Sequence, residues 1–492
     1  MFRPRDRWWQ MEWARRLGLG RLAELGGRAA LPQDIFIRSL DIPTRARRDV
    51  ERLTPAEADE LAAFCAGVNA YLAGKDPNDI APEYGLLAML GVQATPEPWE
   101  PLHTLVFAYV MQAVLSLNSV VYKLLRAGYE AHGGPALAEM LLPDYDFERM
   151  PLIMQPGWLP SPAPLPPLPA VPLPDLSGMR AEFLKIISTL GGGGSNNWVL
   201  SGTRTESGAP LLANDPHLAI QIPVIWYAVG LHGTSDACPY DVVGLTFPQY
   251  PLIVVGHNAR IGWGVTNVGT DIAELFALER HPQDAGQVFH NGAWQALQTV
   301  TEEILVAGEG AYTLTRQRSP FGPLVQDVLK LDQPYALQWG SDQPNRLLTA
   351  VDLLCQAQDW EQFQHALTFW DAPAQNFVYA DVDGNIGYVC SGAIPDRPTN
   401  GRLPVPGVDD SARWAGMLDP RHNPRLLNPA AGFIASANNA VLHPADFPQP
   451  IAQQWDYGYR AARIEALIQA TEKHTLATCA AIQHDDFSPL AG

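Results

Sequence analysis

Hydrophobic residues follow a helical spacing in the first 150 residues of the chain. In one segment they recur every three or four positions, which places them on a single face of a helix. These residues are Leu61, Phe64, Val68 and Leu72. The preceding Thr54-Pro55-Ala56-Glu57 is a capping box with proline in the first turn, so it predicts where this helix begins. The nearly continuous apolar run from Leu105 to Leu117 predicts a second helix inside the core.

After residue 195 the pattern becomes that of β-strands. Short runs rich in β-branched and aromatic residues alternate with turn residues. They lie at 198–201, 224–231, 241–247, 252–257 and 261–266. Residues 376–390 predict a hairpin with Asp383-Gly384 at its turn. Helical spacing returns at 460–470, where Ile464, Leu467 and Ile468 share one face.

The segment between these two regions has a composition of its own. Residues 151–174 hold ten prolines, a density that neither a helix nor a central strand accepts. Residues 191–194 are four consecutive glycines. We therefore divide the chain into a helical region at 1–150, a proline-rich linker at 151–194 and a β-rich region at 195–492.

Composition and charge narrow the class of protein. The chain has 492 residues and a net charge of −19, which argues against a nucleic-acid partner because such proteins carry a basic surface. Its five cysteines include no Cys-x-x-Cys pair, so no zinc ribbon or redox motif is predicted. No apolar run approaches the roughly 20 residues that cross a bilayer, so we expect no membrane span.

The junction of the glycines with Ser195 offers a specific chemistry. Gly194 is followed directly by Ser195-Asn196-Asn197 and an apolar, strand-like run. Cleavage between Gly194 and Ser195 would give Ser195 a free α-amine, which titrates near pH 8 and can activate the neighbouring hydroxyl. The non-catalytic alternative is a flexible linker, since Gly-Gly-Gly-Gly-Ser is typical of such linkers. A phosphate-binding loop is disfavoured because no Lys-Ser or Lys-Thr pair closes the run.

Two other hydrolase types lack their motifs, and several residues fit an N-terminal serine instead. The chain contains neither Gly-x-Ser-x-Gly nor His-Glu-x-x-His. An N-terminal serine needs oxyanion donors and a group that holds its amine. The candidates are Asn438-Asn439, Arg460, Arg463 and His217, although each alone is more often a turn, a surface residue or a structural contact. Asp271 and Glu274 are candidate calcium ligands or a solvated strand edge.

Taken together, these segments resemble the penicillin acylase family of N-terminal-nucleophile hydrolases, which includes penicillin, cephalosporin and acyl-homoserine-lactone acylases. The resemblance runs along most of the chain, and the order and spacing of the segments make it specific. The segments are 6–12 with 15–16, 20–27, 194–198, 213–218, 256–258, 263–267, 380–388 and 437–439.

The resemblance implies roles for particular residues. Ser195 would be the nucleophile freed by autoproteolysis, with Asn438 and the backbone N–H of Asn267 as oxyanion donors. His217 falls at a position whose backbone contacts the serine region. Arg463 matches the arginine that orients the new terminus better than Arg460 does. Asp271 and Glu274 match a strand that carries calcium ligands in several members, so a structural calcium ion is expected, while the chemistry needs no cofactor.

The resemblance also implies a fold, a function and a location. The family fold is an α+β, αββα sandwich of two antiparallel sheets, here with a helical N-terminal region. The expected function is hydrolysis of a small-molecule acyl amide by two processed chains that stay associated. The alternatives are a non-catalytic binding protein with a glycine hinge and an inactive acylase fragment, since the chain matches the family as though truncated at both ends. A periplasmic or secreted location follows from the resemblance, and the absence of a recognisable signal peptide leaves the cytoplasm open.

Overall fold

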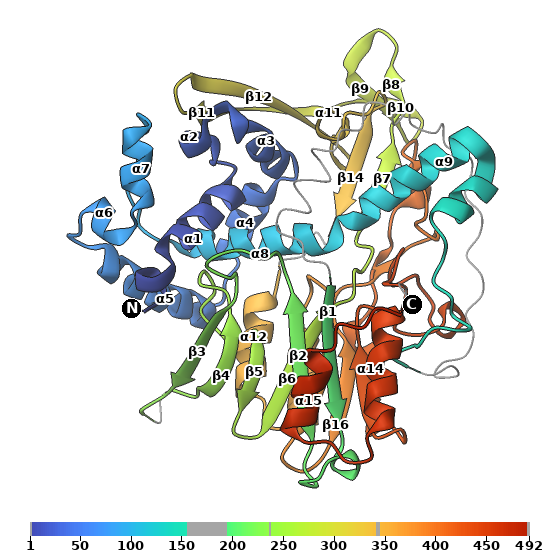
Figure 1. The fold of residues 1–492 in the computed structure, drawn as a ribbon. Helices are drawn as coiled ribbons and strands as arrows, with labels where there is room; N and C mark the ends of the chain where they lie inside the picture. Colours follow the sequence, from blue (N-terminus) through green and yellow to red (C-terminus); the bar gives the residue numbers. More distant parts are fainter. Residues whose placement is uncertain (1, 155–193, 236–237, 341–344, 490–492) are drawn as a thin grey trace.

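The N-terminal part of the protein is built from helices (Figure 1). The computed structural model describes residues 2–154, 194–235, 238–340 and 345–489. The helices are α1 (Phe2–Leu19), α2 (Ala23–Gly26), α3 (Leu31–Ser39), α4 (Ile42–Val50), α5 (Pro55–Leu72), α6 (Pro77–Ile80), α7 (Glu83–Met89), α8 (Pro101–Ser116) and α9 (Asn118–Leu141). Thr54 and Glu57 form the predicted capping box of α5. The proline-rich and glycine-rich predictions for 155–193 lie outside the described residues.

Helix α8 crosses the centre of the molecule and is apolar on nearly all sides. Most of its side chains are buried, including Val106, Val110 and Val114, which belong to the main helical core. A helix that is hydrophobic all round has to be surrounded by protein. The stretch Pro101–Leu141 is long and apolar enough to cross a membrane, but 89% of its most apolar window is buried inside the protein, as expected of a core helix.

Two antiparallel sheets stack face to face below α8. The smaller has the order β2-β1-β21 and the larger has the order β20-β16-β15-β6-β5-β4-β3. Their strands are β1 (Gly194–Leu200), β2 (Leu211–His217), β3 (Tyr227–His232), β4 (Asp241–Thr246), β5 (Val255–Asn258), β6 (Ile261–Asn267), β15 (Gln375–Asp381), β16 (Ile386–Cys390), β20 (Arg425–Leu427) and β21 (Phe433–Ser436). The hairpin β15–β16 is the one predicted at 376–390.

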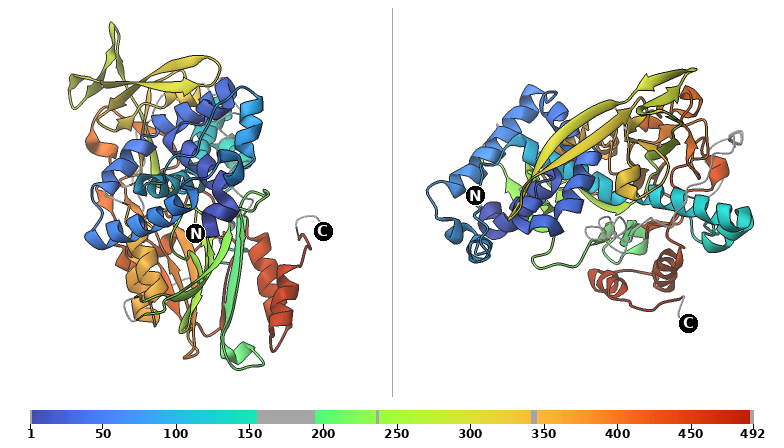
Figure 2. Two further views of the ribbon diagram at one scale, coloured as in Figure 1. Left: turned by 90° about the vertical axis from the view of Figure 1, so that its left-hand side faces the viewer. Right: turned by 90° about the horizontal axis from the view of Figure 1, so that it is seen from above.

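Helices cover the outer face of each sheet, so the layers run helix, sheet, sheet, helix (Figure 2, left). Helices α14 (Tyr459–Ala470) and α15 (Leu476–Gln483) lie on the smaller sheet, and α12 (Leu347–Gln356) and α13 (Trp360–Leu367) lie on the larger. The α+β class with antiparallel sheets and a helical N-terminal region is therefore confirmed.

Alternation along β1 decides which residues face the site. Trp198 and Leu200 pack with Ile464 and Ile468 of α14. Val199 points the other way, into the core between the sheets with Val378. Because successive side chains of a strand point to opposite faces, Ser195 lies on the same face of β1 as Val199, between the two sheets.

The remaining elements form an upper part that packs on the N-terminal helices. A long hairpin of β11 (Gln298–Val306) and β12 (Gly310–Ser319) lies against α2 and α3 (Figure 1). The other elements are β7 (Ala273–Ala277), β8 (Arg280–His281), β9 (Asp284–His290), β10 (Ala293–Ala296), β13 (Gly322–Pro323), α11 (Gln326–Leu329), β14 (Tyr335–Trp339), β17 (Pro395–Asp396), β18 (Val405–Pro406) and β19 (Gly416–Met417).

Candidate active site around Ser195

Ser195 is the second residue of β1 and is only 7% exposed. Gly194, which precedes it, has φ 145° and packs directly on two polar side chains. A Cβ at this position would lie 2.6 Å from Arg460 Nη2 and 3.0 Å from Asn438 Oδ1. Only glycine tolerates both the backbone angle and the contact. The peptide bond between Gly194 and Ser195 is therefore held against Asn438 and Arg460.

Asn438 contacts both sides of the candidate site. It follows β21 with a left-handed φ of 65°, which asparagine adopts more readily than most residues. Its Oδ1 accepts hydrogen bonds from the backbone N of Ser195 at 2.6 Å and from Arg460 Nη2 at 3.0 Å. Its Nδ2 donates to the carbonyl oxygen of Asn267 at 2.8 Å. An amide nitrogen carries two hydrogens, so the second remains for another acceptor.

The backbone N–H of Asn267 is not part of the ladder between β6 and β15. The next residue, Val268, donates its N–H to Ala374 at the start of β15. Successive N–H groups of a strand point to opposite sides, so those of Asn267 and Val265 point away from β15. The Asn214 side chain of β2 bonds both backbone groups of Val265, and Asn438 bonds the carbonyl of Asn267. Asn267 and Asn438 also line the same cavity as Ser195, so the Asn267 N–H and the second Nδ2 hydrogen of Asn438 are candidate donors there.

Arg460, not Arg463, holds the start of β1, and this corrects the choice made from the sequence. Arg460 Nη1 donates to the Ser195 carbonyl at 2.9 Å and to Asn196 Oδ1 at 2.7 Å. Its Nη2 donates to the Ala437 carbonyl at 2.7 Å and to Asp456 Oδ2 at 2.9 Å. Arg463 lies almost one turn further along α14 and pairs with Asp485 at 2.7 Å. The hydrogen bonds therefore place Arg460 at the start of β1, while those of Arg463 go to Asp485.

His217 lies opposite Gly194 in the β1–β2 ladder, so its backbone is beside the start of β1. Its Nε2 is 2.7 Å from Asp215 Oδ2, and this contact lowers the pKa of Asp215. The side chain of His217 is 39% exposed. The backbone of His217 therefore lies beside Gly194, and the residue lines a cavity that Ser195 also borders.

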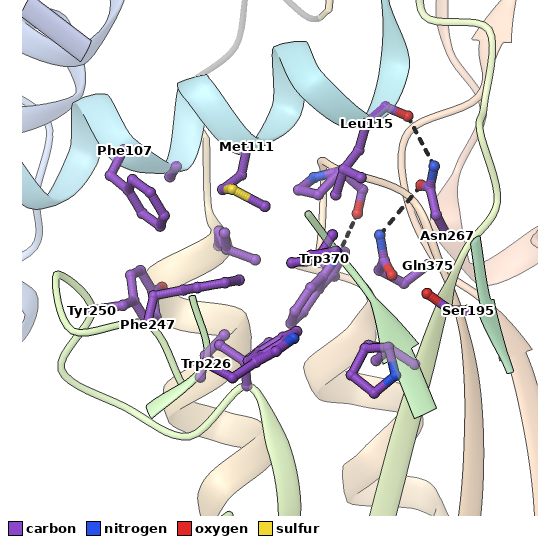
Figure 3. A pocket seen from close by; sticks show the side chains of 18 residues that line it. Phe107, Met111, Leu115, Ser195, Trp226, Phe247, Tyr250, Asn267, Trp370 and Gln375 are labelled. Carbon is purple, nitrogen blue, oxygen red and sulfur yellow. Dashed lines mark hydrogen bonds between the residues drawn. The ribbon is translucent and has the colours of Figure 1, made fainter. Parts of the chain in front are cut away.

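A cavity on one side of Ser195 is lined almost entirely by apolar side chains (Figure 3). The centre of a water molecule can reach about 80 Å³ of it. Phe107 and Met111 reach it from α8, and Trp226 and Phe247 stack on one another with centroids 4.5 Å apart. Ser195 lies at the edge of this cavity (Figure 3). The arrangement suits an apolar group attached to the atom that the serine attacks.

A second cavity also borders Ser195, and its walls are more polar than those of the first. It shares Ser195, Asn267, Leu115 and Leu218 with the apolar cavity. Its further lining includes Asn118, Tyr122, Gln454 and Tyr457, together with His217, Asn438 and Arg460. Ser195 therefore borders both cavities, and Asn267 and Asn438 line the more polar one.

The two carboxylates predicted as calcium ligands have protein cations as partners instead. Lys123 Nζ lies 2.8 Å from Asp271 Oδ2 and 3.1 Å from Glu274 Oε1. Arg397 Nη1 lies 2.7 Å from Asp271 Oδ2 and 3.4 Å from Glu274 Oε2. Calcium requires six to eight oxygen ligands, and within the described ranges no group of three or more His, Cys, Asp or Glu residues is placed to hold a metal. These residues do not fit a calcium ion.

The penicillin amidase family profile matches residues 3–492, nearly the whole chain. The chain belongs to the penicillin amidase family. Among similar proteins, the penicillin acylase 2 proenzyme of Pseudomonas sp. (strain SE83) is 34% identical, with 99% of this chain and 61% of that protein covered. The acyl-homoserine lactone acylase QuiP of Pseudomonas aeruginosa is 29% identical, with 98% and 57% covered.

A solved structure of this family, the thermostable penicillin G acylase from Alcaligenes faecalis, is also similar. It aligns with a TM-score of 0.52 and 28% identity over 57% of this chain and 50% of that chain. The chain thus spans about 60% of the length of the curated relatives it matches. The family resemblance predicted from the sequence is confirmed.

A buried polar network behind the candidate site was not predicted. Asn376 of β15 donates to Thr266 Oγ1 at 3.1 Å and accepts from the Tyr388 hydroxyl at 2.6 Å. Thr266 Oγ1 in turn lies 2.7 Å from Ser436 Oγ, just before Asn438. The network links the strands that carry Asn267 and Asn438. The only sequence signal was the presence of polar residues at strand positions that the alternation assigns to the core.

Proposed function

We propose that this acylase-family chain is an amide hydrolase whose nucleophile is Ser195 after cleavage of the Gly194–Ser195 bond. The single observation that carries the proposal is the 2.6 Å hydrogen bond from the backbone N of Ser195 to Asn438 Oδ1. In the continuous chain this nitrogen is an amide. After cleavage it would be an amine held in the same place. Because it belongs to the same residue as the hydroxyl, it could serve as the local base.

Cleavage itself would use the same groups. The Ser195 hydroxyl would add to the carbonyl carbon of Gly194, and the C–N bond would then break to leave an ester and a free α-amine. Water would hydrolyse the ester, which leaves a carboxylate on Gly194 and restores the hydroxyl. The proenzyme name of the relative from Pseudomonas sp. supports such maturation.

Turnover would follow the same sequence with an external amide. The Ser195 Oγ attacks the substrate carbonyl while the α-amine accepts the hydroxyl proton. The negative oxygen is stabilised by the Asn267 N–H and the second Nδ2 hydrogen of Asn438. The proton passes to the leaving amine, and water then hydrolyses the acyl-enzyme. Two preorganised donors at one oxygen are worth several kcal/mol of barrier, since loss of one typically costs a factor of about 10²–10³.

The two cavities suggest how the substrate lies. Its acyl group would occupy the apolar cavity between Met111 and Trp226, and its amine would face the polar cavity beside Tyr122 and Gln454. The relatives are named penicillin acylases and acyl-homoserine lactone acylases, and both kinds of name describe a small acyl amide. We infer no role for calcium or another cofactor in these steps.

The test begins with the Ser195→Ala variant beside the unaltered chain on a denaturing gel. We expect two bands for the unaltered chain, the larger with Ser195 as its first residue by mass spectrometry, and a single band for Ser195→Ala. Hydrolysis of chromogenic acyl anilides should accompany the two-band form only. Ser195→Cys, which keeps a nucleophile at the same atom, is the matched control and should still be cleaved. Turnover by an uncleaved chain would refute the proposal, and a single inactive band for the unaltered chain would favour the inactive-fragment alternative.

A further inference from the structure

Four charged side chains are fully buried together between the upstream and downstream parts of the chain. Lys123 belongs to α9, Glu274 belongs to β7, Asp271 lies just before β7, and Arg397 lies just after β17. Each has a side-chain exposure of 0%. Isolated ions of this kind are very costly to bury, so they persist only where they are paired and hydrogen-bonded.

The cluster is neutral and its central oxygen is saturated. It contains two cations and two carboxylates, so no net charge is left for a metal ion to balance. Asp271 Oδ2 accepts from Lys123 at 2.8 Å, from Arg397 at 2.7 Å and from Gln453 Nε2 at 2.9 Å.

Protein packs closely against the Oδ2 side of Asp271. A Cβ on Gly401 would come within 2.8 Å of Asp271 Oδ2 and also meet the Arg397 guanidinium. Arg397 further stacks over the Trp414 ring at 5.3 Å and bonds the backbone carbonyl of Asp271. The second cation thus covers this side of the carboxylate, while Asp271 Oδ1 is buried without a hydrogen-bond partner.

The cluster also connects the segments that carry the site. Asp271 lies four residues after Asn267, and Gln453 lies three residues before Asp456, the carboxylate partner of Arg460. Lys123 alone comes from the part of the chain upstream of Ser195. After cleavage it would be on one polypeptide, and its carboxylate partners would be on the other.

We propose that Lys123 and Arg397 supply, from within the protein, the positive charge that balances Asp271 and Glu274, and that Lys123 thereby joins these carboxylates to the upstream chain, so that the processed chains associate without a metal ion. The two-chain part of this inference rests on the proposed cleavage, whereas the metal independence does not. Removing Lys123 leaves two buried carboxylates and one cation, which is strongly destabilising. Removing one carboxylate at the same time restores neutrality.

The experiment compares four proteins with and without excess EGTA or Ca²⁺. They are the unaltered chain, Lys123→Met, Lys123→Met combined with Glu274→Gln, and Lys75→Met as a control on the exposed surface of the same upstream part. For the unaltered chain we expect the same Tm in both solutions and retention of both chains when the downstream chain is captured by a tag. Lys123→Met should lose about 5 °C or more of Tm and release the upstream chain. The double variant should regain part of the lost Tm and retain part of the upstream chain. Lys75→Met should behave as the unaltered chain.

The same Tm measurements are made in an uncleaved Ser195→Ala background, so that failure of cleavage and failure of the cluster are separated. If the chain is never cleaved, the effect of Lys123→Met on Tm still tests the cluster. A fall in Tm of the unaltered chain in EGTA, or a rise in Ca²⁺, would overturn the proposal. So would a Lys123→Met protein as stable as Lys75→Met. Should Lys123→Met fail to accumulate, the EGTA comparison on the unaltered chain alone still decides the metal independence.

Discussion

Replacement of Arg460 by methionine should affect the reaction far more than the same change at Arg463. Both arginines belong to α14, yet only Arg460 reaches Ser195, Asn196 and Asn438. Arg463 instead forms an exposed pair with Asp485. The two variants remove the same charge from the same helix, so a difference between them reports the contacts rather than the net charge.

The expected fall in kcat for Arg460→Met follows from the contact that Asn438 would lose. Arg460 Nη2 bonds Asn438 Oδ1 at 3.0 Å, and the same guanidinium bonds the carbonyl oxygens on both sides of the site, at Ser195 and Ala437. Without it the amide has one fewer constraint, and its Nδ2 is no longer fixed beside the developing oxyanion. Loss of one such donor raises the barrier by about 3 kcal/mol, which corresponds to a fall in kcat of about 10². Arg460→Lys keeps the charge but not the planar fork, so an intermediate loss of about 10-fold is expected.

The assay measures kcat and KM with a chromogenic acyl anilide on fully cleaved protein, after the cleaved fraction is quantified on a gel. Arg460→Met should lower kcat with little change in KM, because the guanidinium contacts the nucleophile's strand rather than the acyl cavity. Arg463→Met should retain kcat, since an exposed ion pair contributes only about 0–1 kcal/mol. Equal activity of the two variants, or a larger loss at Arg463, would refute this assignment.

Three further outcomes follow from other parts of the structure. Asn376→Leu should leave the Tyr388 hydroxyl without its acceptor and Thr266 with Ser436 alone, lowering the free energy of unfolding by about 1–3 kcal/mol and also lowering kcat. Urea titration and kinetics check both, and a stability loss with unchanged kcat would deny Asn376 a positioning role. Trp226→Ala should lower kcat/KM for an arylacetyl amide by about 10-fold or more but change an acetyl amide little, and equal losses for both would contradict the cavity as the acyl site. Burial, with Asp352 and Glu57 nearby, raises the pKa of Glu60 to about 7. A raised carboxyl pKa stabilises the fold below the unfolded value near 4.5 and loses that contribution as the pH rises through 7. Glu60→Gln should therefore raise Tm at pH 8 and leave it unchanged at pH 4.5, and an equal shift at both pH values would contradict the assigned pKa.

The sequence predicted the fold class because hydrophobic spacing and capping are local signals. The capping box at Thr54, the hairpin at 376–390 and the strand that starts at the glycines all depend on residues that are neighbours in the chain. Ser195 and Asn438 could also be proposed, because glycine runs and Asn-Asn turns are visible as patterns. The structure adds the distance between them, which no local pattern contains.

The choice between Arg460 and Arg463 could not be made correctly from the sequence. Both residues lie in the first turns of a helix whose apolar face was predicted, and their orientation depends on how that helix lies on β1. The partners of Asp271 and Glu274 could not be predicted from the sequence either, because they also depend on the tertiary structure. Lys123 is about 150 positions away in sequence, and nothing near it indicates which carboxylates it meets.

Strand β1 is paired with β2 from its first residue, Gly194, and with β21 from Asn197 onward. Scission at Ser195 would therefore sever a covalent bond at the end of a ladder that is already complete. The new terminus has no reason to move, and the precursor would differ from the mature form mainly in charge and connectivity. Such maturation would need no refolding of β1. Its rate would depend on the attack at the Gly194 carbonyl rather than on a large rearrangement.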